Sequence, residues 1–220
     1  MRLYAVSVIM LFVHVDGWRG LVYMTTSKTA QNLVKCHISD ALEEINQLEH
    51  GVHYMITYPN LTTLRELYSN FTHKQIKDNN ELVLINPFYE TTDSVRQVLS
   101  HCDHNMDVSK YEKEKALLIA DSMEEYFGQQ PHKYFKHALH YSKKMQKKGI
   151  SVLADLGVYR HKSMYKELVD YESSLPRKTD HINIKGFCLY HQKDFDKFSE
   201  QQKRKLIKHH GKAIKIVETQ

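Results

Sequence analysis

The chain contains few of the residues that cross-link or punctuate a fold: 3 cysteines, 4 prolines and 8 glycines among 220 residues. Cys36, Cys102 and Cys188 are odd in number, far apart and not arranged as C-x-x-C pairs. They therefore indicate neither a disulfide framework nor a zinc ribbon. A reducing environment fits this use of cysteine, and we expect a cytoplasmic protein.

A glycine-rich phosphate loop is also missing. A nucleotide-binding α/β protein places G-x-x-x-x-G-K-[ST] where its first strand enters a helix, because the backbone N–H groups surround phosphates and the lysine offsets their charge. The corresponding segment here reads YPNLTT at residues 58–63, with neither the glycines nor the lysine. This substitution favours sensing or binding over hydrolysis, and we expect no enzymatic activity, no catalytic residues and no cofactor.

Other catalytic and binding motifs are absent as well. The sequence has no G-x-S-x-G elbow, no H-E-x-x-H pair and no recognisable nucleic-acid-binding motif. Among 15 histidines, the stretch HCDH at 101–104 and the pair His137 and His140 are the nearest to ligand spacings. An ordinary loop and a surface pair explain them better, so the sequence predicts no metal site.

The net charge of +5 is a mild excess of 31 basic over 26 acidic residues, with basic clusters at 143–148 and 203–205. These clusters are typical of solvated helix faces and helix ends. We expect no direct contact with nucleic acid.

Residues 1–23 form an uncertain apolar segment in which Arg2 precedes an apolar stretch over 4–15. The stretch resembles part of a signal peptide but is too short to span a bilayer. Our preferred interpretation is an extended gene start with Met24 as the initiator, and the alternative is a membrane-proximal leader. We expect no membrane association.

A helix is predicted over 24–49, because apolar residues recur there at spacings of three and four: Ala30, Val34, Ile38, Ala41, Ile45 and Leu48. This stripe requires a partner surface. Packing on its own domain is one interpretation, and a homodimer through the same helix of a second subunit is the other.

From residue 50 to 220 the sequence alternates short apolar runs with helix-patterned stretches, at 52–58, 82–85, 116–120, 150–153, 187–190 and 213–217. Such continuous apolar strands are typical of a parallel sheet covered on both faces. The predicted fold is a single three-layer α/β domain with a mostly parallel sheet of about six strands and helices on both faces.

Ligands of open parallel sheets bind beyond the carboxyl ends of the strands. The candidate ligand-binding residues there are Tyr58, Asn60, Thr62, Thr63, Asn86, Phe88, Asp121, Asp155 and Tyr190. The two aspartates could hold a metal or a polarised water on neighbouring strands, or could simply cap the turns that follow. The aromatic residues could line one apolar pocket or belong to the core.

Several short segments carry a family resemblance: HGVHYMITY at 50–58, ADS at 120–122, EYF at 125–127, LVDYE at 168–172 and GFCLY at 186–190. Together they resemble a MEDS domain, the sensory domain named for methanogens, methylotrophs and the dichloromethane regulator DcmR. The similarity extends from about His50 to Val217. It implies a RecA-like or KaiC-like fold that has lost its phosphate loop and senses small hydrocarbon-derived ligands.

The resemblance also implies a separate output partner, because relatives are often joined to a kinase or DNA-binding module and this sequence has neither. We therefore expect a non-enzymatic sensor of a small molecule, acting on a separate histidine kinase or transcription regulator. One alternative is a divergent nucleotide-binding enzyme with Thr62, Thr63, Asp121 and Asp155 around Mg²⁺. The other is an interaction partner of a kinase that takes no ligand.

Overall fold

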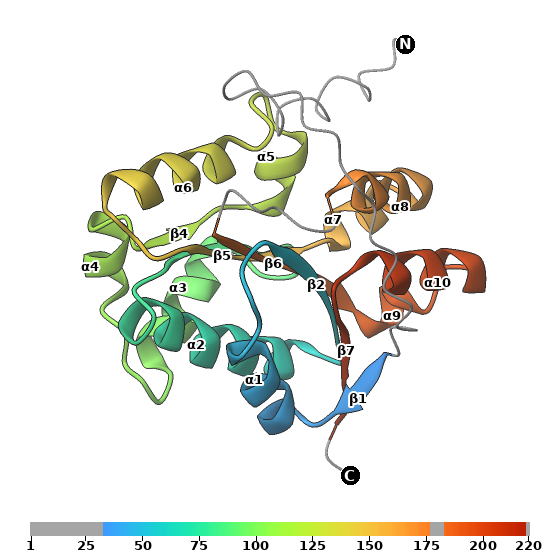
Figure 1. Ribbon diagram of the computed structural model, residues 1–220, viewed down its shortest axis with the longest axis horizontal. Helices are drawn as coiled ribbons and strands as arrows, with labels where there is room; N and C mark the ends of the chain where they lie inside the picture. Colours follow the sequence, from blue (N-terminus) through green and yellow to red (C-terminus); the bar gives the residue numbers. More distant parts are fainter. Residues whose placement is uncertain (1–32, 177–182, 219–220) are drawn as a thin grey trace. The chain divides into compact units, whose positions relative to one another are not determined.

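A computed structural model describes residues 33–176 and 183–218 of the chain. Seven parallel strands form one sheet in the order β1-β7-β2-β6-β5-β3-β4 (Figure 1). Their bounds are β1 Val34–Cys36, β2 Val52–Tyr58, β3 Leu82–Asn86, β4 Leu117–Ile119, β5 Ile150–Asp155, β6 Ile184–His191 and β7 Ala213–Ile216.

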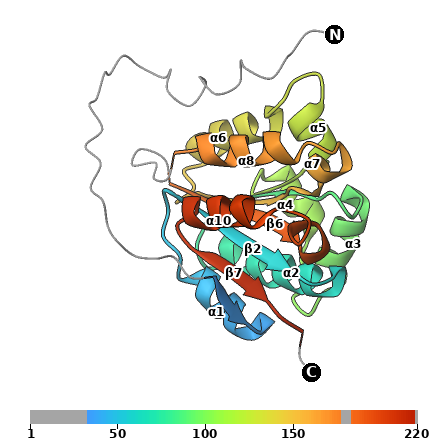
Figure 2. The same ribbon diagram turned by 90° about the vertical axis from the view of Figure 1, so that its right-hand side faces the viewer.

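Helices cover both faces of this sheet, as Figures 1 and 2 show. The first face carries α1 Ile38–Asn46, α2 Leu61–Lys77, α3 Thr92–His101 and α4 Val108–Lys113. The second face carries α5 Ser122–Phe127, α6 Lys133–Lys144, α7 Gly157–His161, α8 Tyr165–Ser174, α9 Gln192–Phe195 and α10 Glu200–His209. The predicted three-layer α/β fold is therefore confirmed.

Alternate residues of the central strands enter the two cores. On β2, Ile56 and Tyr58 pack with the helices of the first face, whereas Met55 packs with those of the second. β2 pairs with β6 in parallel from Val52 opposite Lys185 to Tyr58 opposite His191. Both faces of these strands are buried, which explains why their sequences are continuous apolar runs.

The six predicted strands all occur, with ends that differ by at most three residues from the predicted ones. A capping box begins α10: Ser199 accepts from the Gln202 N–H, and the Gln202 side chain accepts from the Ser199 N–H. Asn60 caps α2, because its side-chain oxygen accepts from the Thr63 N–H.

The helix predicted over 24–49 is shorter than its pattern suggested. Residues 34–36 form β1, which pairs with β7, and the helix begins only at Ile38. The open edge of β7 offers backbone partners to this stretch, and that tertiary gain overrides a helical spacing of apolar residues. Ala30 and the segment 1–23 lie outside the described residues.

The apolar stripe of this helix packs on its own domain. Ala41 and Ile45 are fully buried in the core that α1 shares with α2 and the sheet. A homodimer through this stripe would have to expose them, so the first interpretation of the stripe fits the structure.

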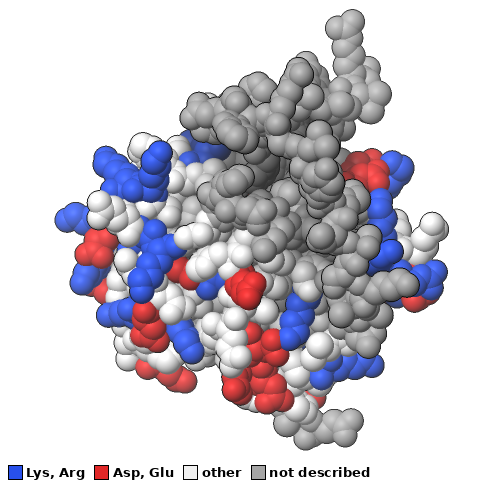
Figure 3. Space-filling model, viewed as in Figure 1, with Lys and Arg blue, Asp and Glu red and all other residues white. Residues whose placement is uncertain are grey.

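Charged side chains are interspersed on the face drawn in Figure 3, where acidic ones gather over the region of α1. No one sign of charge dominates this view. Among the described helices, none combines the length and apolar character needed to cross a bilayer.

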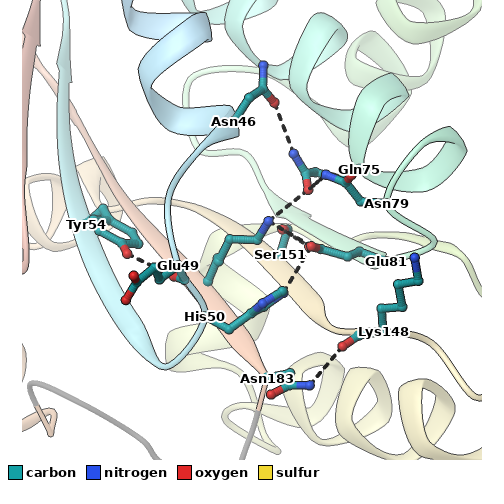
Figure 4. A network of polar contacts seen from close by, with 11 residues as sticks. Asn46, Glu49, His50, Tyr54, Gln75, Asn79, Glu81, Lys148, Ser151 and Asn183 are labelled. Carbon is teal, nitrogen blue, oxygen red and sulfur yellow. Dashed lines mark hydrogen bonds and ion pairs between the residues drawn. The ribbon is translucent and has the colours of Figure 1, made fainter.

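A buried ion pair lies near the amino ends of the central strands. Lys185 Nζ of β6 is 2.7 Å from Glu81 Oε1, and both side chains are almost fully buried. Neighbouring side chains make further hydrogen bonds with the pair: Gln75 Oε1 accepts from Lys185 at 2.9 Å, and the Ser151 hydroxyl donates to Glu81 at 2.5 Å. His50 adds a contact to Glu81 at 3.0 Å (Figure 4). The network joins α2, β5, β6 and the residue that precedes β3.

We predict that Lys185→Met lowers the free energy of unfolding by about 3–5 kcal/mol, because it leaves the Glu81 carboxylate buried without its cation. The double variant Lys185→Met/Glu81→Gln should recover part of this loss. Urea unfolding of both single variants and the double variant measures the coupling. Lys166→Met, which breaks the exposed pair with Asp170, is the control and should leave the midpoint close to wild type. Additive losses in the cycle would contradict the prediction.

Candidate functional site

The turn between β2 and α2 consists of Pro59 and Asn60 alone. Both polar groups of the Asn60 side chain already have partners in the protein. Its oxygen accepts from the Thr63 N–H at 2.9 Å, and its amide donates to Glu218 at 2.6 Å. Thr62 is exposed on the first turn of the helix. A two-residue connection has too few N–H groups to surround a phosphate chain, and the Glu218 carboxylate adds a negative charge at the helix N-terminus.

Asp155 ends β5 and is 1% exposed. One carboxylate oxygen accepts from the Gly157 N–H at 2.9 Å. Asp155 therefore caps the turn after its strand, which was the second of the two roles that the sequence left open. The other oxygen accepts from the Tyr58 hydroxyl at 2.8 Å, which joins the ends of β2 and β5 across β6. Burial raises the pKa of Asp155 to about 7, against the lowering effect of these two hydrogen bonds.

Asn86 and Ser122 fasten the neighbouring strand ends. The Asn86 amide donates to the Ala120 carbonyl at 3.2 Å. The Ser122 hydroxyl lies 2.8 Å from the Asn86 carbonyl and 3.2 Å from the Asp155 carbonyl. These contacts hold the carboxyl ends of β3, β4 and β5 together and leave the Asn86 side chain committed to the protein itself.

Asp121 lies apart from this group. It is exposed, and its side chain accepts from the Glu124 N–H as the cap of α5. β3 lies between β4 and β5, so the prediction that the two aspartates end neighbouring strands is wrong. Four strand spacings separate β2 from β4, roughly 19 Å, so Thr63 and Asp121 do not surround one ion.

The three candidate aromatic residues do not share one pocket. Tyr58 packs in the core of the first face, whereas Tyr190 packs with Phe195 and Phe198 on the second face. Their register explains this: Tyr190 lies opposite Thr57, the residue before Tyr58, and successive strand residues face opposite sides. The prediction of a common pocket is therefore wrong for Tyr190.

A small cavity of about 10 Å³ lies at this edge, on the scale of one water molecule. It is lined by Leu64, Tyr68, Ile85, Asn86, Pro87, Phe88, Tyr89, Glu90, Leu153, Asp155 and Leu189. The cavity thus brings together Asn86, Phe88 and Asp155 of the predicted set, and Tyr58 contacts it through Asp155. The remaining predicted residues lie elsewhere.

Two further carboxylates at this edge were not predicted. Glu90 is buried, and its carboxylate accepts hydrogen bonds from Arg65 at 2.7 Å, from the Ser94 hydroxyl at 2.9 Å and from the Tyr68 hydroxyl at 3.3 Å. Asp194 of α9 is held by Arg160 at 2.5 Å and by the Tyr89 hydroxyl. The run NPFYE at 86–90, directly after a strand, is the sequence signal that could have indicated Tyr89 and Glu90.

Residues 52–211 match a family model, described as MEDS, the MEthanogen/methylotroph, DcmR Sensory domain. The chain belongs to the MEDS family. Comparison with curated proteins finds no significant match. The MEDS match includes every residue of the cavity, whereas β1, α1 and β7 lie outside it. These three elements extend the sheet and its first face beyond the matched part.

We predict that Asp155 makes the stability of this MEDS protein fall as pH rises from about 4 to 7. Its carboxyl keeps a proton in the native state up to a pKa of about 7, whereas the unfolded chain loses that proton near 4. The native state binds more protons in this window, so each pH unit costs stability. Asp155→Asn removes the effect.

The measurement is urea unfolding of wild type and Asp155→Asn at several pH values. The stability of the variant relative to wild type should increase by up to about 4 kcal/mol between pH 4 and pH 8. Asp121→Asn, which removes an exposed carboxylate, is the matched control for the change in net charge. A difference between Asp155→Asn and wild type that stays constant across the range would show that the carboxyl ionises normally.

Proposed function

We propose that the protein is a non-enzymatic sensor that binds a small uncharged molecule at the carboxyl ends of β2, β3, β5 and β6. The observation that carries the proposal is the small cavity whose accessible wall is apolar, with Asp155 among the residues that line it. A ligand that widens this cavity would bury its hydrocarbon group against the apolar wall and bring its functional group toward Asp155. The MEDS family is named as a sensory domain, which agrees with this role.

The charges at this edge argue for a neutral ligand. Glu90, Asp155 and Asp194 are buried carboxylates, and the arginines beside two of them are already paired at 2.7 and 2.5 Å. A triphosphate would meet these carboxylates without a phosphate loop to offset its charge. With its pKa near 7, Asp155 is partly protonated at neutral pH and can donate or accept a hydrogen bond.

A ligand can signal only if it binds one arrangement of the protein better than another. Phe88 and Tyr89 line the cavity and lie directly against Gly157, where an added Cβ would come within 2.7 and 2.6 Å of their rings. Ring positions and the start of α7 are therefore coupled by close packing. Because Arg160 of α7 pairs with Asp194 of α9, a ligand that moves these rings also biases both helices.

The output of this sensor is a surface that changes with α7 and α9, read by a separate histidine kinase or transcription regulator. This part of the proposal rests on the resemblance described above and on the place of both helices at the ligand-binding edge. Contact with nucleic acid is not part of the proposal.

The proposed ligand class is tested by thermal unfolding with methanol, formaldehyde, dichloromethane, methylamine and Mg-ATP as probes. A neutral one-carbon probe at about 100 times its Kd should raise Tm by roughly 5–10 °C, because ligand binding stabilises the native state. Methylamine, which is a cation at neutral pH, and Mg-ATP should leave Tm unchanged. A saturable shift with Mg-ATP alone would favour the nucleotide-binding alternative over a small-molecule sensor.

We further predict that Gly157→Ala lowers the affinity for the neutral probe at least tenfold, since its methyl group displaces Phe88 and Tyr89 from the cavity wall. Gly186→Ala is the matched control, because the nearest atom to its added Cβ is at an ordinary 3.4 Å. Titration followed by intrinsic fluorescence or calorimetry gives both affinities. Equal affinities in the two variants would place the ligand elsewhere.

A further inference from the structure

Three potential metal ligands converge between the sheet and the helices of the second face. His53 comes from the start of β2, Glu172 from α8, and His210 from the residue that ends α10. Their exposed fractions are 8%, 0% and 0%. One ligand atom from each lies within 4.8 Å of the others. The cluster is near the amino end of β2, away from the ligand-binding edge at Tyr58.

The facing atoms of this cluster lack ordinary hydrogen bonds. Within the described part of the chain, His53 Nε2 has no hydrogen-bond partner. His210 Nε2 lies 2.9 Å from a Glu172 oxygen as an ion pair, although neither atom meets the geometry of a regular hydrogen bond. Buried polar atoms without partners cost about 1–3 kcal/mol each. Three buried side chains whose ligand atoms converge without regular hydrogen bonds require an explanation.

Backbone hydrogen bonds hold the imidazole rings of His53 and His210 on the sides that face away from the cluster. His210 Nδ1 is 2.8 Å from the Leu206 carbonyl, so this nitrogen carries a proton and Nε2 is the atom that faces Glu172. His53 has a hydrogen bond with the backbone of Pro176, and its Nε2 is the atom that faces Glu172 and His210. Backbone carbonyls that orient imidazole rings in this way are the usual supporting contacts of metal-bound histidines.

Cys188 lies beside the carboxylate. Its thiol is close enough to Glu172 for a hydrogen bond. On the paired strands, Cys188 is opposite Met55 while His53 is opposite Gly186, so Cys188 and His53 are diagonal neighbours on the same face. A soft thiolate donor is therefore available next to two imidazoles and a carboxylate.

We propose that His53, Glu172 and His210 bind one Zn²⁺ ion, with Cys188 as the fourth ligand. Two imidazoles, a carboxylate and a thiolate are all donors that zinc takes in proteins, in tetrahedral geometry. Ligand atoms about 2.0–2.3 Å from such an ion lie roughly 3.3–3.7 Å apart, so the two histidines and Glu172 require only a small contraction. The Cys188 sulfur lies outside this 4.8 Å group and has to turn toward the ion. The carboxylate and the thiolate would balance the double charge of the ion inside the core.

The burial of the cluster assigns a structural role to this ion. Structural zinc sites are closed, with four protein ligands and no open position for a substrate. The ion would fasten β2, β6, α8 and the end of α10 to one point, and its binding would release the thiol proton of Cys188. This inference does not depend on the proposed sensing function, because its residues lie outside the cavity.

The test uses full-length protein purified without a histidine tag or chelator. Elemental mass spectrometry should find about one zinc per chain. The protein is then unfolded with a chelator and refolded with no metal, Zn²⁺ or Co²⁺, since a buried site fills during folding. Zn²⁺ should raise Tm, and Co²⁺ should give the visible bands of a tetrahedral ion together with a thiolate-to-cobalt absorption.

Glu172→Gln and His53→Asn should each lower metal affinity at least about 100-fold. Cys188→Ser should remove the thiolate absorption. His104→Asn is the matched control, because His104 stacks on His73 in a partly exposed pair away from the cluster. Refolded wild type that takes up neither metal would overturn the proposal, as would full metal content in both ligand variants. If the variants do not fold, X-ray absorption of the zinc-loaded wild type decides: a first shell without histidine nitrogens would also overturn it.

Discussion

Burial of the parallel sheet on both faces is the constraint on which the rest of the structure depends. Any polar side chain on the central strands must find its partner inside the protein, because no water reaches it. Lys185 on β6 does so with Glu81, and Tyr58 on β2 does so with Asp155. Among the described residues, His53 on β2 and Tyr190 on β6 are exceptions, since the His53 Nε2 and the Tyr190 hydroxyl have no such partner.

The three polar clusters differ in what they do with this constraint. The Lys185 network is saturated by neutral and charged neighbours and is best understood as part of the scaffold. The Asp155 pair has no cation among its contacts and lies beside an apolar cavity, so its carboxyl remains free to change protonation. The histidine cluster leaves His53 Nε2 without a partner, and the proposed ion would supply one. The scaffold network, the proposed ligand site and the proposed metal site thus occupy separate parts of one sheet.

The fold could be predicted from the sequence because its signal is local. Apolar runs alternating with helical periodicity located all six predicted strands. The sequence did not reveal β1, because a three-residue edge strand is too short to show an alternation of apolar and polar residues. The strand order was not accessible either, and the supposed closeness of Asp121 and Asp155 failed for that reason.

The sites depend on such non-local information even more. Tyr58 and Tyr190 both end apolar runs, and only the register of β2 against β6 reveals that they face opposite sides. His53, Glu172 and His210 are separated by 119 and 38 positions, so no spacing rule could join them. The predictions that succeeded concern caps and strand ends, where the deciding contacts lie within a few residues.

The strand order also bears on how the protein is made. β2 emerges early from the ribosome, yet its two neighbours in the described sheet, β6 and β7, both come from residues after 183. The centre of the sheet therefore cannot close until most of the chain has been translated. Until then the apolar β2 has no strand to pair with, and during that interval a nascent-chain chaperone would have the most to protect.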